Sequence, residues 1–75
     1  MHITFYTKPN CPLCEEAKAM MKLAQEDFPL TWNEVNIEMD DAIHEKYMLM
    51  IPVIEKGGAV LLYGSIGYMD VIGLF

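Results

Sequence analysis

Two cysteines, Cys11 and Cys14, carry the most reactive side chains of this 75-residue chain, and they stand three positions apart. A pair with this spacing can cycle between a dithiol and a disulfide, or it can bind a metal ion. A purely structural disulfide is a weak explanation, because so short a loop would restrict the unfolded chain very little. The choice between redox and metal chemistry therefore depends on the elements that hold the two sulfurs.

The pair lies just after a predicted strand and opens a predicted helix. Residues His2–Tyr6 are rich in β-branched and aromatic side chains, which favours a strand, and the polar segment Thr7–Asn10 predicts a turn. A helix from Pro12 to about Asp27 follows. Proline suits its first position, and apolar side chains recur at intervals of three and four until Pro29 ends it.

The start of this helix supplies a reason for thiol reactivity. Cys11 is predicted at the N-cap and Cys14 one turn inside, so the free amide groups of Leu13 and Cys14 point toward the Cys11 sulfur. These amides and the helix dipole favour a thiolate over a thiol. Lys8 adds positive charge nearby, whereas the two glutamates that follow Cys14 act in the opposite direction.

This arrangement suits a two-step thiol–disulfide exchange. An exposed thiolate at Cys11 attacks a substrate disulfide and forms a mixed disulfide with it. Cys14, predicted to be the more buried of the two, then attacks Cys11 and releases the reduced substrate. A cysteine pair with two residues between its members, coupled to a β-α-β pattern, is typical of thioredoxin-like redox motifs.

The rest of the chain predicts an α/β fold with a small core. Asp40 and Asp41 are candidate caps for a second helix, and glycines after Lys56 favour a hairpin turn. The predicted order is β-α-β-α-β-β-α in a mixed four-stranded sheet with helices on its faces. After the first helix the expected elements are a strand at Leu30–Ile37, a helix at about Asp41–Met48, strands at Pro52–Glu55 and Ala59–Tyr63, and a short helix or turn within Tyr68–Phe75.

Size and charge narrow the class of protein. Residues 1–75 fit one domain, and a monomer is the default expectation. Eleven acidic against five basic side chains give a net charge of −6, which disfavours nucleic-acid binding because phosphate contacts need clustered lysine and arginine. Neither a membrane-spanning run nor a signal-peptide pattern is present, so a cytoplasmic protein without membrane association is expected.

Metal binding is the main alternative to redox chemistry. A structural zinc site needs four nitrogen or sulfur ligands, but no second cysteine pair exists and the only histidines, His2 and His44, stand far apart in the sequence. An iron–sulfur cluster shared by a dimer would also be compatible with two cysteines. A third alternative is a binding module that keeps the fold without catalysis.

The opening segment ITFYTKPNCPLCEEAKAMM, residues 3–21, resembles the start of the glutaredoxin family. Proline directly after the first cysteine is the glutaredoxin type of motif, whereas thioredoxins usually place tryptophan before it and Gly-Pro within the pair. The resemblance implies a thioredoxin-like three-layer sandwich and a disulfide oxidoreductase. The catalytic pair would be Cys11 and Cys14, with Pro12 and Leu13 beside the substrate.

A second segment, Met50–Glu55, resembles the place where these proteins carry a cis-proline. The resemblance implies that Pro52 is cis and faces the cysteines. It also implies that the backbone of Ile51 pairs with an extended substrate, as an added strand would. Glutaredoxins usually have Thr-Val before this proline, whereas this chain has Met50 and Ile51.

Other departures concern glutathione. The family usually carries tyrosine at the third motif position, where this chain has Leu13, and Gly-Gly followed by an acid near the end, where it has GSIGYMD. Lys8 and Asp70 are the candidates for the charged ends of glutathione, although Asp70 equally suits a helix cap.

The chain resembles most closely the small glutaredoxin-like proteins of bacteria. The implied partners are protein disulfides, with glutathione as a co-substrate or thioredoxin reductase as the electron source. A tightly bound cofactor is not expected.

Overall fold

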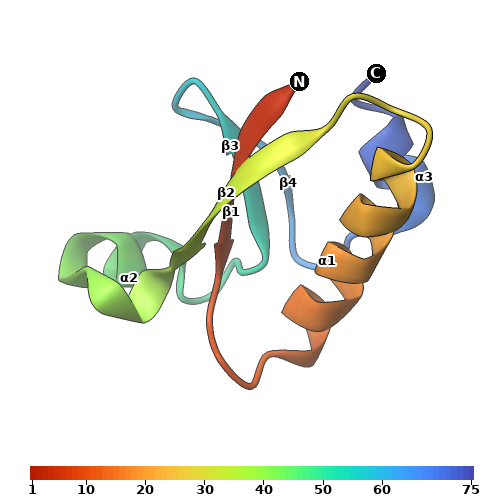
Figure 1. Cartoon of the computed structure of the whole chain (residues 1–75). Coiled ribbons are helices and arrows are strands. Elements are labelled where there is room, and N and C mark those ends of the chain that lie inside the picture. Colours follow the sequence, from red (N-terminus) through yellow and green to blue (C-terminus); the bar gives the residue numbers. More distant parts are fainter.

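The computed structural model describes residues 1–75 and contains the predicted order of elements (Figure 1). The elements are β1 His2–Thr7, α1 Pro12–Gln25, β2 Thr31–Asn36, a 3-10 turn at Ile37–Met39, α2 Asp41–Tyr47, β3 Val53–Lys56, β4 Ala59–Tyr63 and α3 Tyr68–Ile72. No helix combines the length and the apolar character that crossing a membrane requires.

The four strands form one mixed sheet in the order β2-β1-β3-β4. Strand β1 pairs in parallel with β2, whereas the β1–β3 and β3–β4 pairs are antiparallel. A parallel pair needs a crossover connection, and α1 supplies it. The sheet confirms the mixed four-stranded arrangement expected from the sequence.

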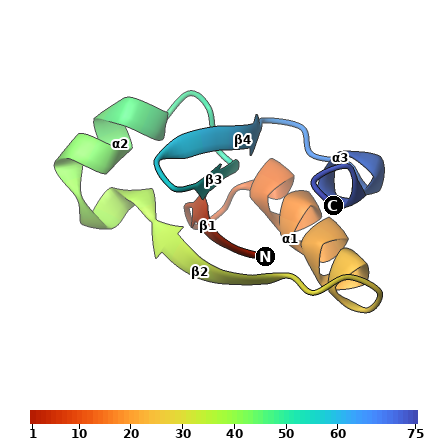
Figure 2. The same cartoon turned by 90° about the horizontal axis from the view of Figure 1, so that it is seen from above.

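Helices cover both faces of the sheet, which gives three layers. Figure 2 shows α1 and α3 together on one side and α2 on the other. Side chains alternate along each strand. Ile3 and Phe5 of β1 therefore belong to the cluster that α1 and α3 cover, while Tyr6 packs with Val53 and Tyr47 on the α2 side.

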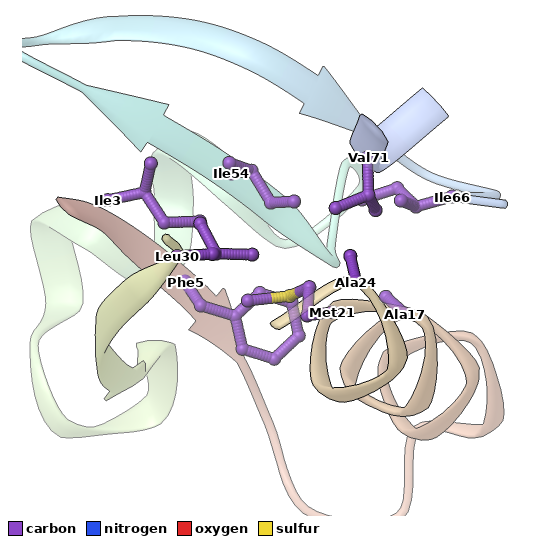
Figure 3. Close-up of a cluster of buried hydrophobic side chains, with 9 residues drawn as sticks. All are labelled: Ile3, Phe5, Ala17, Met21, Ala24, Leu30, Ile54, Ile66 and Val71. Carbon is purple, nitrogen blue, oxygen red and sulfur yellow. The ribbon is translucent and has the colours of Figure 1, made fainter. Parts of the chain in front are cut away.

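The larger core cluster explains how α1 is fixed against the sheet. Ala17, Met21 and Ala24 recur on one face of α1, and each has no exposed surface. The alanines let the helix approach closely, while Met21 fills the space beside Phe5 (Figure 3). Replacing a fully buried phenylalanine with alanine typically costs about 3–5 kcal/mol of stability. This packing therefore fixes α1 against the sheet.

Several boundaries differ from the sequence-based expectation by one or two residues. Helix α1 ends at Gln25 rather than about Asp27, because the amide of Asp27 bonds to the Ala24 carbonyl three residues back and tightens the last turn. Strand β2 begins after Leu30, whose side chain is buried in the core instead. Of the two candidate caps of α2, Asp40 is the one used, since its Oδ1 accepts the Ile43 amide at 3.0 Å.

Candidate active site

Cys11 lies at the N-cap of α1, as the sequence predicts. Its backbone is extended, with φ −117° and ψ 101°, and Pro12 takes the first helical position. The Cys11 sulfur accepts a hydrogen bond from the Cys14 amide at 3.2 Å, so one free amide of the helix end is satisfied by sulfur. The Leu13 amide, which was also expected to point at the sulfur, makes no such bond.

The two cysteines form a disulfide with their Cα atoms 5.2 Å apart. In this oxidised state Cys11 is 8% exposed and Cys14 is 3% exposed. Cys14 is therefore the more deeply buried of the two residues, in the order expected from the sequence. Cys11 is itself buried in this oxidised state, whereas the sequence interpretation expected an exposed Cys11 thiolate in the reduced protein.

The loop before Cys11 is tightly turned. Asn10 has a positive φ of 58°, in the left-handed region that asparagine tolerates better than most residues other than glycine. This turn redirects the chain from the end of β1 into the start of α1.

Pro52 is cis, in agreement with the resemblance. Its position follows from the antiparallel pairing of β1 and β3, in which Tyr6 lies opposite Val53. Pro52, one residue before Val53, is therefore at the end of β1 from which the loop to Cys11 departs. Its side chain is buried.

The backbone of Ile51 is partly used within the protein. Its amide donates to the Tyr47 carbonyl at 3.1 Å, while the carbonyls of Met50 and Pro52 both accept from the Gly64 amide. The Ile51 carbonyl accepts no hydrogen bond and is the group left for an added strand. Of the Ile51 backbone groups, the carbonyl and not the amide is thus unpaired for the substrate pairing that the resemblance implies.

A polar cleft of about 210 Å³ opens beside Cys14. Its lining comes from the end of β1 and the following loop, from α1 and from β2: Thr7, Lys8, Pro9, Cys14, Glu15, Lys18, Glu34 and Asn36. Within it the Lys18 ammonium lies 2.9 Å from Oε1 of Glu34. Cys11 does not line this cleft.

Lys18 and Glu34 line the cleft with Cys14, and the sequence interpretation did not single them out. A signal existed for Lys18, because it follows Cys14 by four residues and so lies on the same side of the helix. No sequence signal marked Glu34, because its position beside the cleft depends on the parallel register in which it lies opposite Phe5.

Comparison with known proteins identifies the family. The family model of the glutaredoxin-like domain (DUF836) matches residues 2–72. The chain belongs to the glutaredoxin-like domain family.

Two solved structures share the fold of this glutaredoxin-like domain. One is a Northeast Structural Genomics target protein from X. campestris, with a TM-score of 0.81, 23% identity, and coverage of 96% of this chain and 92% of that chain. The other is a malarial protein, with a TM-score of 0.66, 15% identity, and coverage of 97% and 90%. Both similarities concern the fold.

The remaining predicted site residues of the glutaredoxin-like domain fall into two groups. Lys8 is exposed and lines the cleft, and Leu13 is 43% exposed next to the cysteines. Asp70, at the start of α3, does not line the cleft that holds Lys8. Its Oδ2 accepts the Gly67 amide at 2.8 Å, so its carboxylate caps α3. The structure does not bring Lys8 and Asp70 to one cleft.

A second polar cluster lies on the α2 face of the sheet. The Tyr47 hydroxyl donates to Oε2 of Glu55 at 2.6 Å, and the Tyr6 hydroxyl lies 3.4 Å from Oε1. The hydrogen bond to Glu55, together with burial and the Glu55 charge, raises the pKa of Tyr47 to about 12. Burial, and then the Glu55 charge, raises the pKa of Tyr6.

The charged side chains around the cysteines do not converge on a metal position. No group of three or more histidine, cysteine, aspartate or glutamate side chains is arranged to hold a metal ion.

Proposed function

We propose that the chain is a thiol–disulfide oxidoreductase that uses Cys11 and Cys14 to reduce protein disulfides or glutathione mixed disulfides. The observation that carries this proposal is the disulfide between the two cysteines at the first turn of α1, with the Cys14 amide donating to the Cys11 sulfur. A hydrogen bond to sulfur and the positive end of a helix both stabilise a thiolate. Membership of the glutaredoxin-like family supports the same chemistry.

The proposed reaction has two exchange steps. In the reduced protein the Cys11 thiolate attacks one sulfur of the substrate disulfide, which forms a mixed disulfide and releases the other substrate sulfur as a thiolate. The Cys14 thiol then loses its proton and attacks the Cys11 sulfur. The bond between Cys11 and the substrate breaks, and its electron pair leaves on the substrate sulfur, which takes up a proton. The protein ends as the disulfide and the substrate as two thiols.

Substrate would approach over Leu13 and along Ile51 and Pro52. The exposed Leu13 side chain gives an apolar contact beside Cys11, and the Ile51 carbonyl is free to accept a hydrogen bond from an extended substrate. Pro12 fixes the direction in which α1 leaves Cys11. We assign these residues to substrate binding and the two cysteines to catalysis.

The electron source is glutathione or a thioredoxin reductase. Lys8 offers a positive charge to a carboxylate of glutathione, while Asp70 would have to weaken its bond to the Gly67 amide to bind the amine. Residues 1–75 would act as a single monomeric domain in the cytoplasm, with no tightly bound cofactor.

A coupled turnover assay tests the proposal. The protein is given a disulfide substrate and NADPH, with glutathione plus glutathione reductase in one arm and thioredoxin reductase in the other. Turnover in either arm supports the function and identifies the reductant. Silence in both arms, with the protein shown to be folded and fully reduced at the start, would contradict it. Metal analysis of the same preparation checks the zinc and iron–sulfur alternative.

A further inference from the structure

The second exchange step needs a thiolate at the less accessible cysteine. Cys14 is 3% exposed, and burial disfavours the charged form of a thiol. The polar cleft provides the missing contact with solvent, since Cys14 lines it and Cys11 does not. A volume of about 210 Å³ has room for several waters, because each water occupies about 30 Å³ in the liquid.

The cleft also places a cation in the same lining as Cys14. Lys18 lies one turn after Cys14 on the same side of α1, a spacing at which side chains are neighbours. Its ammonium is held 2.9 Å from Oε1 of Glu34, a residue of the neighbouring strand β2. Because the side chains of Lys18 and Glu34 are 37% and 40% exposed, the pair adds little to stability.

We propose that this cleft is the deprotonation route for Cys14, in which cleft water takes the thiol proton, the Lys18 ammonium stabilises the thiolate and the Glu34 carboxylate opposes it. The inference rests on the proposed dithiol function and assigns the control of its second step. Lys18 and Glu34 act through their charges here, since neither forms a bond to the substrate. The proton passes to bulk water, and the electron pair of the thiolate forms the new bond to Cys11.

Four charged side chains face the cleft, and their signs fix the expected effects. Lys8 and Lys18 favour the Cys14 thiolate, whereas Glu15 and Glu34 oppose it. Removing the Lys18 charge should therefore make the thiolate harder to form, and removing the Glu34 charge should make it easier. An ion pair with a purely structural role predicts something different, because either substitution breaks the same pair and both effects then have the same sign.

The test uses the reduced full chain and an uncharged dipyridyl disulfide in stopped-flow absorbance. The first pyridinethione released reports attack by Cys11, and the second reports attack by Cys14 on the mixed disulfide. We expect Lys18→Met to raise the midpoint pH of the second phase by about 0.5–1 unit. The second phase should also slow about two- to threefold at neutral pH. The lower fraction of thiolate slows it, but a more basic thiolate is a better nucleophile, which partly offsets this loss.

Glu34→Gln should move the same midpoint in the opposite direction, and Lys18→Arg should remain close to the wild type. The matched controls are Lys22→Met and Glu26→Gln, which make the same charge changes at exposed positions outside the cleft. Lys18→Met and Glu34→Gln shifts of the same sign, or shifts no larger than those of the controls, would overturn the inference and leave the dithiol function intact. A wild-type trace with a first phase and no second phase would overturn the dithiol function, and the inference with it.

Discussion

Two polar clusters lie on opposite faces of the sheet and differ in how far they are shielded from water. Lys18 and Glu34, on the α1 face, are more than one third exposed and border a cleft. Tyr47, on the α2 face, is 2% exposed and donates to Glu55. An exposed ion pair contributes only about 0–1 kcal/mol, whereas a hydrogen bond to a charged group contributes about 1.5–3 kcal/mol.

This difference in shielding from water distinguishes polar groups that stabilise the fold from polar groups that act at the active site. The hydrogen bond from Tyr47 to Glu55 links α2 to β3 and keeps the Tyr47 hydroxyl protonated. This bond therefore suits a structural role. The Lys18–Glu34 pair adds little to stability and remains in contact with water beside a reactive sulfur. Substitutions of Lys18 and Glu34 should therefore change reactivity, and removal of the Tyr47 hydroxyl should change stability.

The largest expected effect is the loss of turnover in Cys11→Ser. A serine hydroxyl is a far weaker nucleophile than a thiolate, so we expect disulfide reduction to fall by at least about a thousandfold. Serine is also a good N-cap residue, so the free energy of unfolding measured in reducing buffer should change by less than about 1 kcal/mol. Retained turnover in Cys11→Ser would contradict the assignment of Cys11 as the nucleophile.

Tyr47→Phe should have the converse outcome. The substitution keeps the ring but removes the hydroxyl that donates to Glu55, and we expect the free energy of unfolding to fall by about 1–3 kcal/mol. Turnover at a temperature where the variant is folded should match the wild type. The control is Tyr63→Phe, since Tyr63 is 61% exposed on β4. An equal loss of stability in the two variants would remove the structural role assigned to Glu55.

The stability contribution of Tyr47 should also depend on alkaline pH. The pKa of Tyr47 is raised from 10.0 to about 12, so its contribution to stability is complete below pH 10 and is lost as the pH rises toward 12. Over this range the unfolded chain releases the tyrosine proton and the folded chain keeps it, at a cost of up to about 2–3 kcal/mol. Denaturant titrations should show the fall for wild type and Tyr63→Phe, and a shallower fall for Tyr47→Phe. Parallel pH profiles for all three would contradict this prediction.

The smallest effect is expected at Asp70. Asp70→Ala removes the carboxylate that accepts the Gly67 amide and should cost about 0.5–2 kcal/mol, the usual range for a lost cap. If capping is its whole role, the KM for glutathione in the coupled assay should not change. A several-fold rise in that KM without a change in kcat would place Asp70 in the glutathione site instead.

Much of the framework was predictable because it depends on local patterns. The three- and four-residue spacing of Ala17, Met21 and Ala24 predicted the helix and its buried face, and the glycines after Lys56 predicted the hairpin. The N-cap position of Cys11 followed from Pro12. The cis form of Pro52 came from the resemblance, since most bonds before proline are trans.

The missed features depend on how distant segments pair. Glu34 reaches Lys18 only because β2 lies parallel to β1 in a fixed register, and no local pattern in the sequence specifies that register. Glu55 meets Tyr6 and Tyr47 through three separate elements, although each residue alone looks ordinary. The engagement of the Ile51 amide by the Tyr47 carbonyl likewise depends on how α2 ends.

Trapping the mixed disulfide tests most directly whether Cys11 is the nucleophile. The reduced Cys14→Ser variant is mixed with a disulfide-bonded peptide and analysed by intact mass and peptide mapping, beside Cys11→Ser treated identically. The proposed mechanism predicts one covalent adduct on Cys11 in the first variant, which dithiothreitol releases, and no adduct in the second. Absence of an adduct in Cys14→Ser, or equal labelling of Cys14 in the Cys11→Ser variant, would contradict the assignment of Cys11 as the nucleophile.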